Sequence, residues 1–193
     1  MHMAKQWKPL AVVASVLLLL LPGSLAQAQS MTVISGGDDA RTCAFTAEMT
    51  ARLNPSRGDL ASCNRALEQE PLNRRDRAAT FVNRGIVLAA LDRFQDALND
   101  YNSALEIQAE LPQAFIGKGN LYYFAERYDD ALVAYNTALE MNLDEKHVAY
   151  YDMGMAYEKL GNPEAAEQSY RTAIELSPDW TLPQQRLQGL LDQ

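Results

Sequence analysis

The sequence predicts an all-α fold in which similar helical units are stacked along the chain, and two observations lead to this prediction. The first is a recurring pattern built around Gly85, Gly119 and Gly154, which lie 34 and 35 residues apart. A recurrence of about 20 to 50 residues is typical of solenoids, because one repeat cannot bury its hydrophobic face alone. The second is a set of residues typical of helix starts and helix ends, which fall at the boundaries of the expected helices.

The recurring pattern extends well beyond the glycines. Each glycine is followed by an alanine after 12 residues, a tyrosine after 16 and a second alanine after 19. Small residues allow two helices to approach closely, and large aromatic residues fill the remaining space, as dense packing requires. A glycine inside a helix costs about 1 kcal/mol relative to alanine, so the pattern favours glycines at close helix contacts. The residues that follow the glycines are Ala97, Tyr101, Ala104, Ala131, Tyr135, Ala138, Ala166, Tyr170 and Ala173.

The expected helix boundaries carry suitable residues. Pro112 suits the first turn of a helix, where its missing N–H costs nothing. Asn162, Pro163 and Glu164 are typical of an N-cap, a first-turn proline and an acidic first turn. Pro178 is expected to end the last repeat. The segment after it predicts an amphipathic capping helix. The residues expected to face the stack are Trp180, Leu187, Leu190 and Leu191.

The whole pattern resembles the tetratricopeptide repeat family, whose unit is a pair of antiparallel helices of about 34 residues. The family's order of aromatic residue, glycine, alanine and tyrosine is met three times between roughly residues 77 and 178. One departure is that Arg84, Lys118 and Met153 stand where the family prefers leucine. The resemblance implies a right-handed α-solenoid of antiparallel helix pairs with a C-terminal capping helix.

This interpretation divides the chain into seven segments. A degenerate helix pair is expected before the three repeats, because residues 63–68 (CNRALE) match residues 101–106 (YNSALE). The seven segments are a signal peptide (1–28), a flexible mature N-terminus (29–39), the degenerate pair (40–76), three repeats (77–111, 112–146 and 147–178) and the capping helix (179–193).

Residues 1–28 have the order expected of a secretory signal peptide. Lys5 and Lys8 precede an apolar run from Leu10 to Leu21, and a small-residue Ala-Gln-Ala pattern ends at Ala28. The run holds 12 residues, whereas a membrane-spanning helix needs about 20. Cleavage after Ala28 is expected, and a retained N-terminal anchor is the alternative. Because exported bacterial repeat proteins share this arrangement, a periplasmic or secreted bacterial location is expected.

Acidic residues outnumber basic ones, 25 to 17, which gives a formal net charge of −8. The two lysines before residue 28 are the only charged residues of that segment, so the expected mature chain is more acidic still. Nucleic acids and anionic lipid surfaces bind to clustered lysine and arginine. The composition therefore argues against both as partners.

The chain has two cysteines, Cys43 and Cys63. An even pair in an exported protein is most simply a disulfide. A redox pair, a metal site and two free buried thiols are the alternatives. A metal site is disfavoured, because the residues between the two cysteines include no further cysteine or histidine.

The sequence offers no recognisable catalytic arrangement. It contains no glycine-rich phosphate loop, no HExxH and no CxxC motif. His147 is the one histidine after residue 28, and it stands beside Lys146 at a repeat boundary. A non-enzymatic protein without a cofactor or a metal ion is therefore expected.

In a solenoid of helix pairs, the first helix of each pair lines the concave surface. The family resemblance implies that peptides or extended protein segments bind in this groove. The clamp by which some relatives hold a terminal carboxylate is not expected, because apolar and aromatic residues replace its basic residues, and only Asn120 remains. The residues expected to line the groove are Val82, Asn83, Ile86, Gln113, Ile116, Asn120, Tyr123, Phe124, Val148, Tyr151, Asp152 and Met155.

The expected function is a non-enzymatic protein–protein interaction module of the bacterial cell envelope. Two alternatives stay open: a self-assembling structural repeat protein, and an inactive accessory subunit of an envelope hydrolase or secretion complex. Burial of the groove by the C-terminal helix, or by a second copy of the chain in a homo-oligomer, also stays open.

Overall fold

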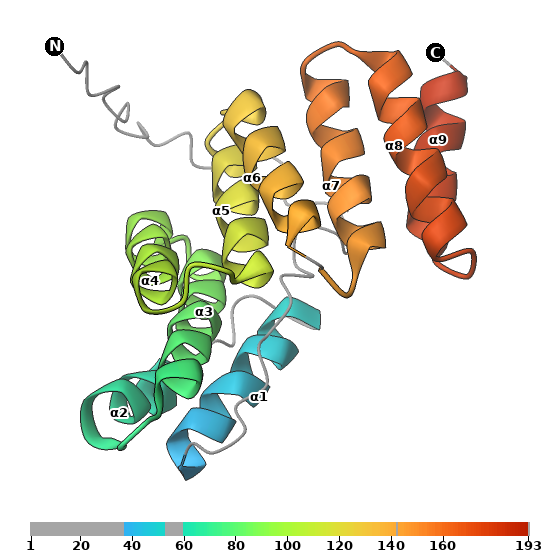
Figure 1. The fold of residues 1–193 in the computed structure, drawn as a ribbon. Helices are drawn as coiled ribbons and strands as arrows, with labels where there is room; N and C mark the ends of the chain where they lie inside the picture. Colours follow the sequence, from blue (N-terminus) through green and yellow to red (C-terminus); the bar gives the residue numbers. More distant parts are fainter. Residues whose placement is uncertain (1–36, 53–59, 142, 193) are drawn as a thin grey trace, which may run out of the picture.

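The computed structural model describes residues 37–52, 60–141 and 143–192. Within these ranges the chain forms nine α-helices and no β-strand, so the predicted all-α fold is confirmed (Figure 1). The expected signal peptide (1–28) lies outside the described residues, as do residues 29–36 of the segment expected to be flexible. The helices are α1 (Asp38–Arg52), α2 (Ala61–Gln69), α3 (Arg74–Ala90), α4 (Phe94–Ile107), α5 (Pro112–Phe124), α6 (Tyr128–Glu140), α7 (Lys146–Lys159), α8 (Pro163–Leu176) and α9 (Thr181–Leu191).

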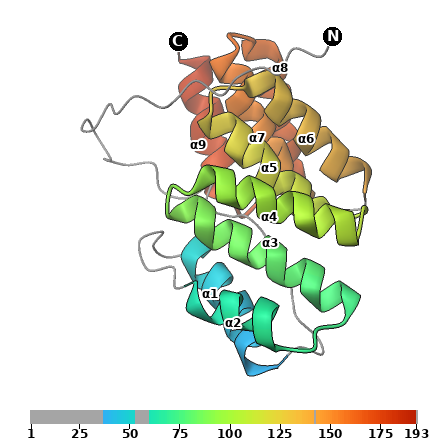
Figure 2. The same ribbon diagram turned by 90° about the vertical axis from the view of Figure 1, so that its left-hand side faces the viewer.

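The helices follow one another along a stack of pairs (Figures 1 and 2). Helix α3 pairs with α4, α5 with α6 and α7 with α8, and α9 packs on α8 at the C-terminal end. The three pairs coincide with the three expected repeats to within three residues at each start. Helix α1 already begins at Asp38, inside the segment that was expected to be flexible. Among the described helices, none is long and apolar enough to cross a lipid bilayer.

The helix starts follow the expected chemistry. Pro112 and Pro163 lie in the first turns of α5 and α8. The side chain of Asn162 accepts a hydrogen bond from the backbone N–H of Ala165 at 3.2 Å, which satisfies one of the free donors of α8. Asn73 caps α3 in the same way.

The two helices of each regular pair are joined by three residues with one common backbone form. The middle residues are Asp92, Glu126 and Gly161, with φ values of 58°, 57° and 69°. This left-handed conformation turns the chain back over the end of the first helix. The residue that follows donates its N–H to a carbonyl oxygen five positions earlier, at 2.8 to 3.0 Å, in the pairs Arg93–Leu88, Arg127–Tyr122 and Asn162–Tyr157.

The three repeated tyrosines are the largest fully buried side chains of the described core, and each is at most 1% exposed. Each ring lies against the glycine of its own repeat. A Cβ atom on that glycine would lie 2.3 to 2.6 Å from the nearest ring carbon, in the pairs Gly85–Tyr101, Gly119–Tyr135 and Gly154–Tyr170. Carbon atoms do not approach so closely, so the ring occupies the space that any other residue would need.

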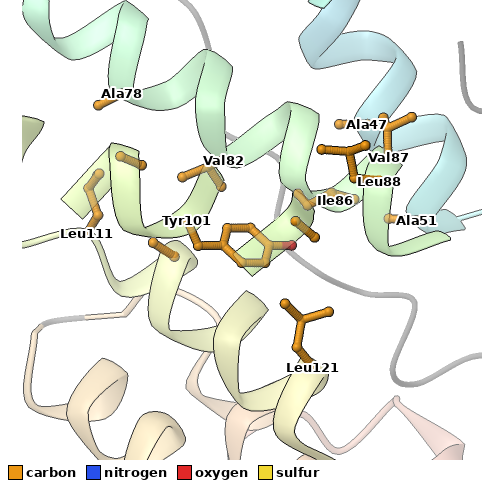
Figure 3. Packing of buried hydrophobic residues seen from close by; sticks show 13 residues of the cluster. Ala47, Ala51, Ala78, Val82, Ile86, Val87, Leu88, Tyr101, Leu111 and Leu121 are labelled. Atoms are coloured by element: carbon orange, nitrogen blue, oxygen red, sulfur yellow. The ribbon is translucent and has the colours of Figure 1, made fainter. Parts of the chain in front are cut away.

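Tyr101 also packs against a glycine of the next repeat. A Cβ atom on Gly117 of α5 would lie 2.3 Å from Cζ of this ring. Tyr101 therefore packs between α3 and α5, with Val82, Ile86 and Leu121 around it (Figure 3). This single ring joins two consecutive helix pairs.

The expected disulfide is present, because Cys43 of α1 and Cys63 of α2 are bonded with an S–S distance of 2.11 Å. Both cysteines are fully buried. At the start of α1 the backbone N–H groups of Asp39 and Ala40 donate to the carboxylate of Glu70, at 2.9 and 3.2 Å. The disulfide and this carboxylate together hold α1 to the segment that contains α2.

Helix α1 nevertheless packs more extensively on α3 than on α2, unlike the first helices of the regular pairs. Ala47 and Ala51 of α1 belong to the same buried cluster as Val82 and Ile86 of α3 (Figure 3). The degenerate pair therefore departs from the regular geometry, and α1 covers part of the surface of α3.

Helix α9 caps the other end of the stack. Pro183 and Leu187 are buried, and the ring of Trp180 lies 4.9 Å from the ring of Tyr151 on α7. The expectation that Leu191 faces the stack is wrong, because this side chain is 55% exposed. It stands at the last residue of α9, about 100° around the helix from the half-buried Leu190.

Reduction of the disulfide is expected to lower the free energy of unfolding by about 3 kcal/mol, because the bond closes a loop of some 20 residues. Urea unfolding with and without reductant measures the difference. A variant with both Cys43→Ala and Cys63→Ala serves as the control, since reductant should not change its stability. Complete alkylation of both cysteines in native, unreduced protein would contradict the disulfide.

The substitution Gly119→Leu is expected to destabilise the fold by about 3 kcal/mol or more, because the new side chain overlaps the ring of Tyr135. The control is Gln168→Leu, a change of the same kind at an exposed position of α8, which should cost less than about 1 kcal/mol. Thermal or urea unfolding compares the two variants. Equal stability of both would show that Gly119 is not at a close helix contact.

Candidate functional site

The structure buries most of the residues that were expected to line an open groove. Nine of the twelve are at most 5% exposed, and only Gln113, Tyr123 and Phe124 keep appreciable exposure. These nine side chains therefore do not line an open surface of the folded chain, and the binding role expected of the twelve residues stays a prediction. The nine buried residues are Val82, Asn83, Ile86, Ile116, Asn120, Val148, Tyr151, Asp152 and Met155.

The first repeat loses its exposed surface to α1. Val82 and Ile86 are 0% and 4% exposed, and both pack in the cluster that includes Ala47 and Ala51. Helical phase places these two residues on the expected face of α3, but it does not reveal that the degenerate pair folds over that face. Ile116 in the second repeat is buried in a cluster shared with α6 and α7.

The third repeat is closed by the C-terminal segment. Tyr151 and Met155 pack in one cluster with Trp180 and Leu187. Trp180 contacts His147 as well, with ring centroids 5.3 Å apart. The alternative that the C-terminal helix covers part of the groove is thus confirmed for this repeat.

Between these two covered ends, four aromatic side chains form a connected surface cluster. The ring of Phe124 stacks on Phe94 at 5.9 Å and meets Tyr123 edge-on at 6.2 Å. Tyr123 in turn contacts Tyr128 at 5.4 Å. Phe124 is 49% exposed, and the other three are partly buried. Phe94, Tyr123, Phe124 and Tyr128 are called the aromatic cluster below.

Sequence reasoning identified Tyr123 and Phe124 but missed Phe94 and Tyr128. These two residues open α4 and α6, and they are 34 residues apart. Because the two residues occupy equivalent positions in consecutive repeats, the sequence contained a pattern that could have identified both. Burial, followed by the neighbouring Tyr128, raises the pKa of Tyr123 to about 12, so its hydroxyl stays protonated at neutral pH.

A polar network fixes α9 against α7 and α8. The hydroxyl of Tyr170 donates a short hydrogen bond to Oε1 of Glu158. Arg186 of α9 approaches the other carboxylate oxygen of Glu158 at 3.8 Å, and its second guanidinium nitrogen lies 3.9 Å from the sulfur of Met155. The guanidinium group of Arg186 therefore interacts with residues at the C-terminal end of the stack.

Asp152 of α7, unlike Glu158, has no hydrogen-bond partner for its carboxylate among the described residues. Its side chain is also fully buried. Nearby, the hydroxyl of Tyr135 donates to Oδ1 of Asn120 at 2.8 Å. Burial raises the pKa of Asp152 well above its ordinary value, because removal from water disfavours the charged form.

The site has the chemistry of recognition. Over residues 37–52, 60–141 and 143–192, no group of three or more His, Cys, Asp or Glu side chains could hold a metal ion. The aromatic cluster offers apolar and π surfaces, whereas the polar side chains of Asp152 and Asn120, on the two adjacent first helices α7 and α5, are buried. Apolar and aromatic side chains with few polar groups are typical of the lining of binding sites.

The substitution Asp152→Asn is expected to stabilise the protein at neutral pH and to have little effect near pH 4. Because the pKa of Asp152 is raised in the folded state, the protonated carboxyl group makes its full contribution to the free energy of unfolding below the unfolded pKa. This contribution is lost as the pH rises through the folded pKa. Between the two pKa values the difference between variant and wild type should grow by up to about 1.4 kcal/mol per pH unit. Urea unfolding of both proteins over pH 4 to 8 measures it, and parallel stability curves would contradict the prediction.

Comparison with known proteins gives a consistent family. Sequence profiles described as "Tetratricopeptide repeat" match residues 76–144 and 147–179, which together are just over half of the chain. A search of curated proteins found no match.

Several solved structures have a similar fold. The chain is 26% identical to YrrB, described as a tetratricopeptide repeat protein with an unusual peptide-binding site, over 69% of this chain and 66% of that one, with a TM-score of 0.59. MamA from Desulfovibrio magneticus RS-1 is 20% identical over 81% of this chain and 85% of its own, with a TM-score of 0.60. A tetratricopeptide repeat protein from Parabacteroides merdae ATCC 43184 is 24% identical over 81% and 60%, with a TM-score of 0.59.

The repeated pattern, the three helix pairs and the matching profiles agree. The chain belongs to the tetratricopeptide repeat family.

Proposed function

We propose that this protein is a non-enzymatic interaction module that binds an extended segment of a partner protein at the aromatic cluster. Tetratricopeptide repeats indicate protein–protein interaction, and proteins of the family are generally non-enzymatic scaffolds. The observation that carries the proposal is the aromatic cluster itself, with Phe124 49% exposed and stacked on Phe94.

The position of the cluster supports a binding role. Helix α1 covers the first repeat, and Trp180 with α9 covers the third, so the middle repeat keeps the accessible part of the surface. Exposed aromatic side chains that are grouped together tend to mark interaction sites. The similarity to YrrB, whose described site binds peptides, favours a peptide-like segment as the ligand.

Export to the bacterial envelope is part of the same proposal. The buried disulfide between Cys43 and Cys63 suits an oxidising compartment, since cytosolic proteins keep their thiols reduced. The signal-peptide pattern of residues 1–28 points in the same direction.

Self-association is a second candidate function, and one observation favours it. Leu176 and Leu191 are 49% and 55% exposed on the last two helices of the stack. Exposed leucines at the end of a stack of repeats permit end-to-end contact between copies, since each repeat normally packs on a neighbour. Size-exclusion chromatography with light scattering, over a range of concentrations, distinguishes a monomeric module from such an assembly.

The proposal predicts that Tyr123→Ala combined with Phe124→Ala abolishes most of the binding of a peptide ligand. A displayed library of random 12-residue peptides, selected on the wild-type protein, supplies the probe, and fluorescence anisotropy measures its Kd. Aromatic anchors in interfaces contribute about 2 kcal/mol or more on truncation, so the Kd should rise about 30-fold or more.

The matched control is Val133→Ala. This side chain is 67% exposed on α6 and lies outside the aromatic cluster, so its truncation should leave the Kd unchanged. Circular dichroism and thermal unfolding establish that each variant is folded. If the selected peptides bind the folded double variant as tightly as the wild type, the aromatic cluster is not the binding surface.

A further inference from the structure

Two acidic residues lie in the turns beside the aromatic cluster. Asp92 precedes Phe94 by two residues, and Glu126 stands midway between Phe124 and Tyr128. Both acidic side chains are exposed, and no ion pair links either of them to another described residue. The turns of the first two helix pairs therefore place one carboxylate each at the edge of the aromatic cluster.

The positive charges of the same two turns are already paired within the chain. Arg93 forms an ion pair with Asp96 at 2.6 Å. Arg127 forms the equivalent pair with Asp130 at 2.7 Å. A further carboxylate, that of Asp129, is exposed directly after the second turn. Because each arginine is balanced by an acidic residue of the helix that follows it, the surface beside the rings keeps a negative charge.

The acidic residues occupy positions that favour glycine. Asp92 and Glu126 have φ values of 58° and 57°, and the third repeat has Gly161 at the same place, with φ 69°. The third repeat also has Pro163 where the first two repeats have an aromatic residue at the start of the second helix. Acidic and aromatic side chains thus occur together in the two repeats that form the cluster, and both are absent from the third.

The carboxylates and the rings are close enough to act on one ligand group. Burial, followed by the neighbouring Glu126 carboxylate, raises the pKa of Tyr128, so this carboxylate lies within electrostatic reach of the cluster. Cations are attracted to carboxylates and also to the faces of aromatic rings. The whole chain carries 25 acidic and 17 basic residues, and this excess attracts basic segments of other proteins.

We propose that the partner segment bound at the aromatic cluster is basic, with a lysine or arginine side chain that contacts Phe124 and faces the carboxylates of Asp92 and Glu126. The ring of Phe124 is 49% exposed, which leaves room for the aliphatic part of such a side chain. Exposed ion pairs are screened by salt, so this part of the binding should depend on salt concentration. The inference rests on the proposed function, because it specifies the segment bound at that same cluster.

The test selects peptides from the random 12-residue library on wild-type protein and on the double variant Asp92→Asn with Glu126→Gln. The matched control is Glu106→Gln with Glu140→Gln, which removes the same charge from exposed positions of α4 and α6. Each control residue lies 12 positions after the first residue of its helix, about 18 Å along the axis. This distance exceeds the Debye length of about 10 Å in 0.1 M salt.

Peptides selected on wild-type protein should be enriched in lysine and arginine relative to the library, and selection on the double variant should reduce this enrichment. For a peptide selected on wild type, fluorescence anisotropy at 50 mM NaCl should give a Kd about fivefold higher or more with the double variant. The control variant should stay within about twofold of wild type. Raising NaCl to 300 mM should weaken binding to wild type about threefold or more, and binding to the double variant less than about twofold.

A second charge-free variant, Asp92→Gly with Glu126→Gly, copies the turn that Gly161 forms in the third repeat. It removes both carboxylates and the left-handed conformation of two residues with side chains, so it should be at least as stable as wild type. Its Kd should rise as much as that of the first double variant. Circular dichroism and thermal unfolding establish that every variant is folded.

The outcomes separate this inference from the proposed function. Selected peptides without an excess of basic residues, or an unchanged Kd in both charge-free variants, would overturn the basic partner alone, provided that Tyr123→Ala with Phe124→Ala still abolishes binding. Self-association of wild type that this aromatic variant loses, seen by light scattering, would identify a second copy as the occupant and overturn the inference. If no peptide is selected, or if binding ignores the aromatic cluster, the proposed function fails and the inference fails with it.

Discussion

The packing of a tyrosine ring against a helical glycine is the contact on which the rest of this structure depends. In each regular pair the tyrosine ring is buried against the glycine. A Cβ atom on that glycine would lie less than 3 Å from the nearest ring carbon. The contact sets both the distance between the two helices and their register, since the ring cannot shift without exposing apolar surface. Tyr101 extends this control across a repeat boundary, because it lies against Gly85 and Gly117. A local pattern of small and aromatic residues therefore determines the geometry of the whole stack.

Much of this geometry follows from the sequence. The spacing of Gly85, Gly119 and Gly154 predicts three helix pairs in the correct register, and Pro112 and Asn162 mark helix starts that the structure confirms. The bond between Cys43 and Cys63 was predicted as well. The openness of the groove could not be predicted, because helical phase gives the face on which Val82 or Tyr151 lies but not what covers that face. Their covers are α1 and Trp180, which belong to the irregular ends, where the repeat pattern gives no guidance.

Two acidic side chains of α7 have opposite surroundings. Glu158 is held by Tyr170 and Arg186, so its charge contributes to fixing the capping helix. Asp152 is more deeply buried and has no such partner in the described chain. Proteins tolerate unfavourable groups mainly where function requires them, and the stability lost there is supplied by the rest of the fold. The regular glycine–tyrosine contacts on both sides of Asp152 are well suited to supply it.

The three-residue turns within the pairs have a consequence for where the chain can change in length. Residues 91–93, 125–127 and 160–162 have equal lengths and the same left-handed middle residue, so this turn allows neither addition nor loss of a residue. The connections between pairs differ, with four residues from α4 to α5 and five from α6 to α7. The extra residue of the 35-residue interval thus lies between pairs, where lengthening a loop costs little. Epitopes, reporter domains or additional repeats are therefore best inserted at residues 108–111 or 141–145. Insertions there do not change the contact between each tyrosine and its glycine.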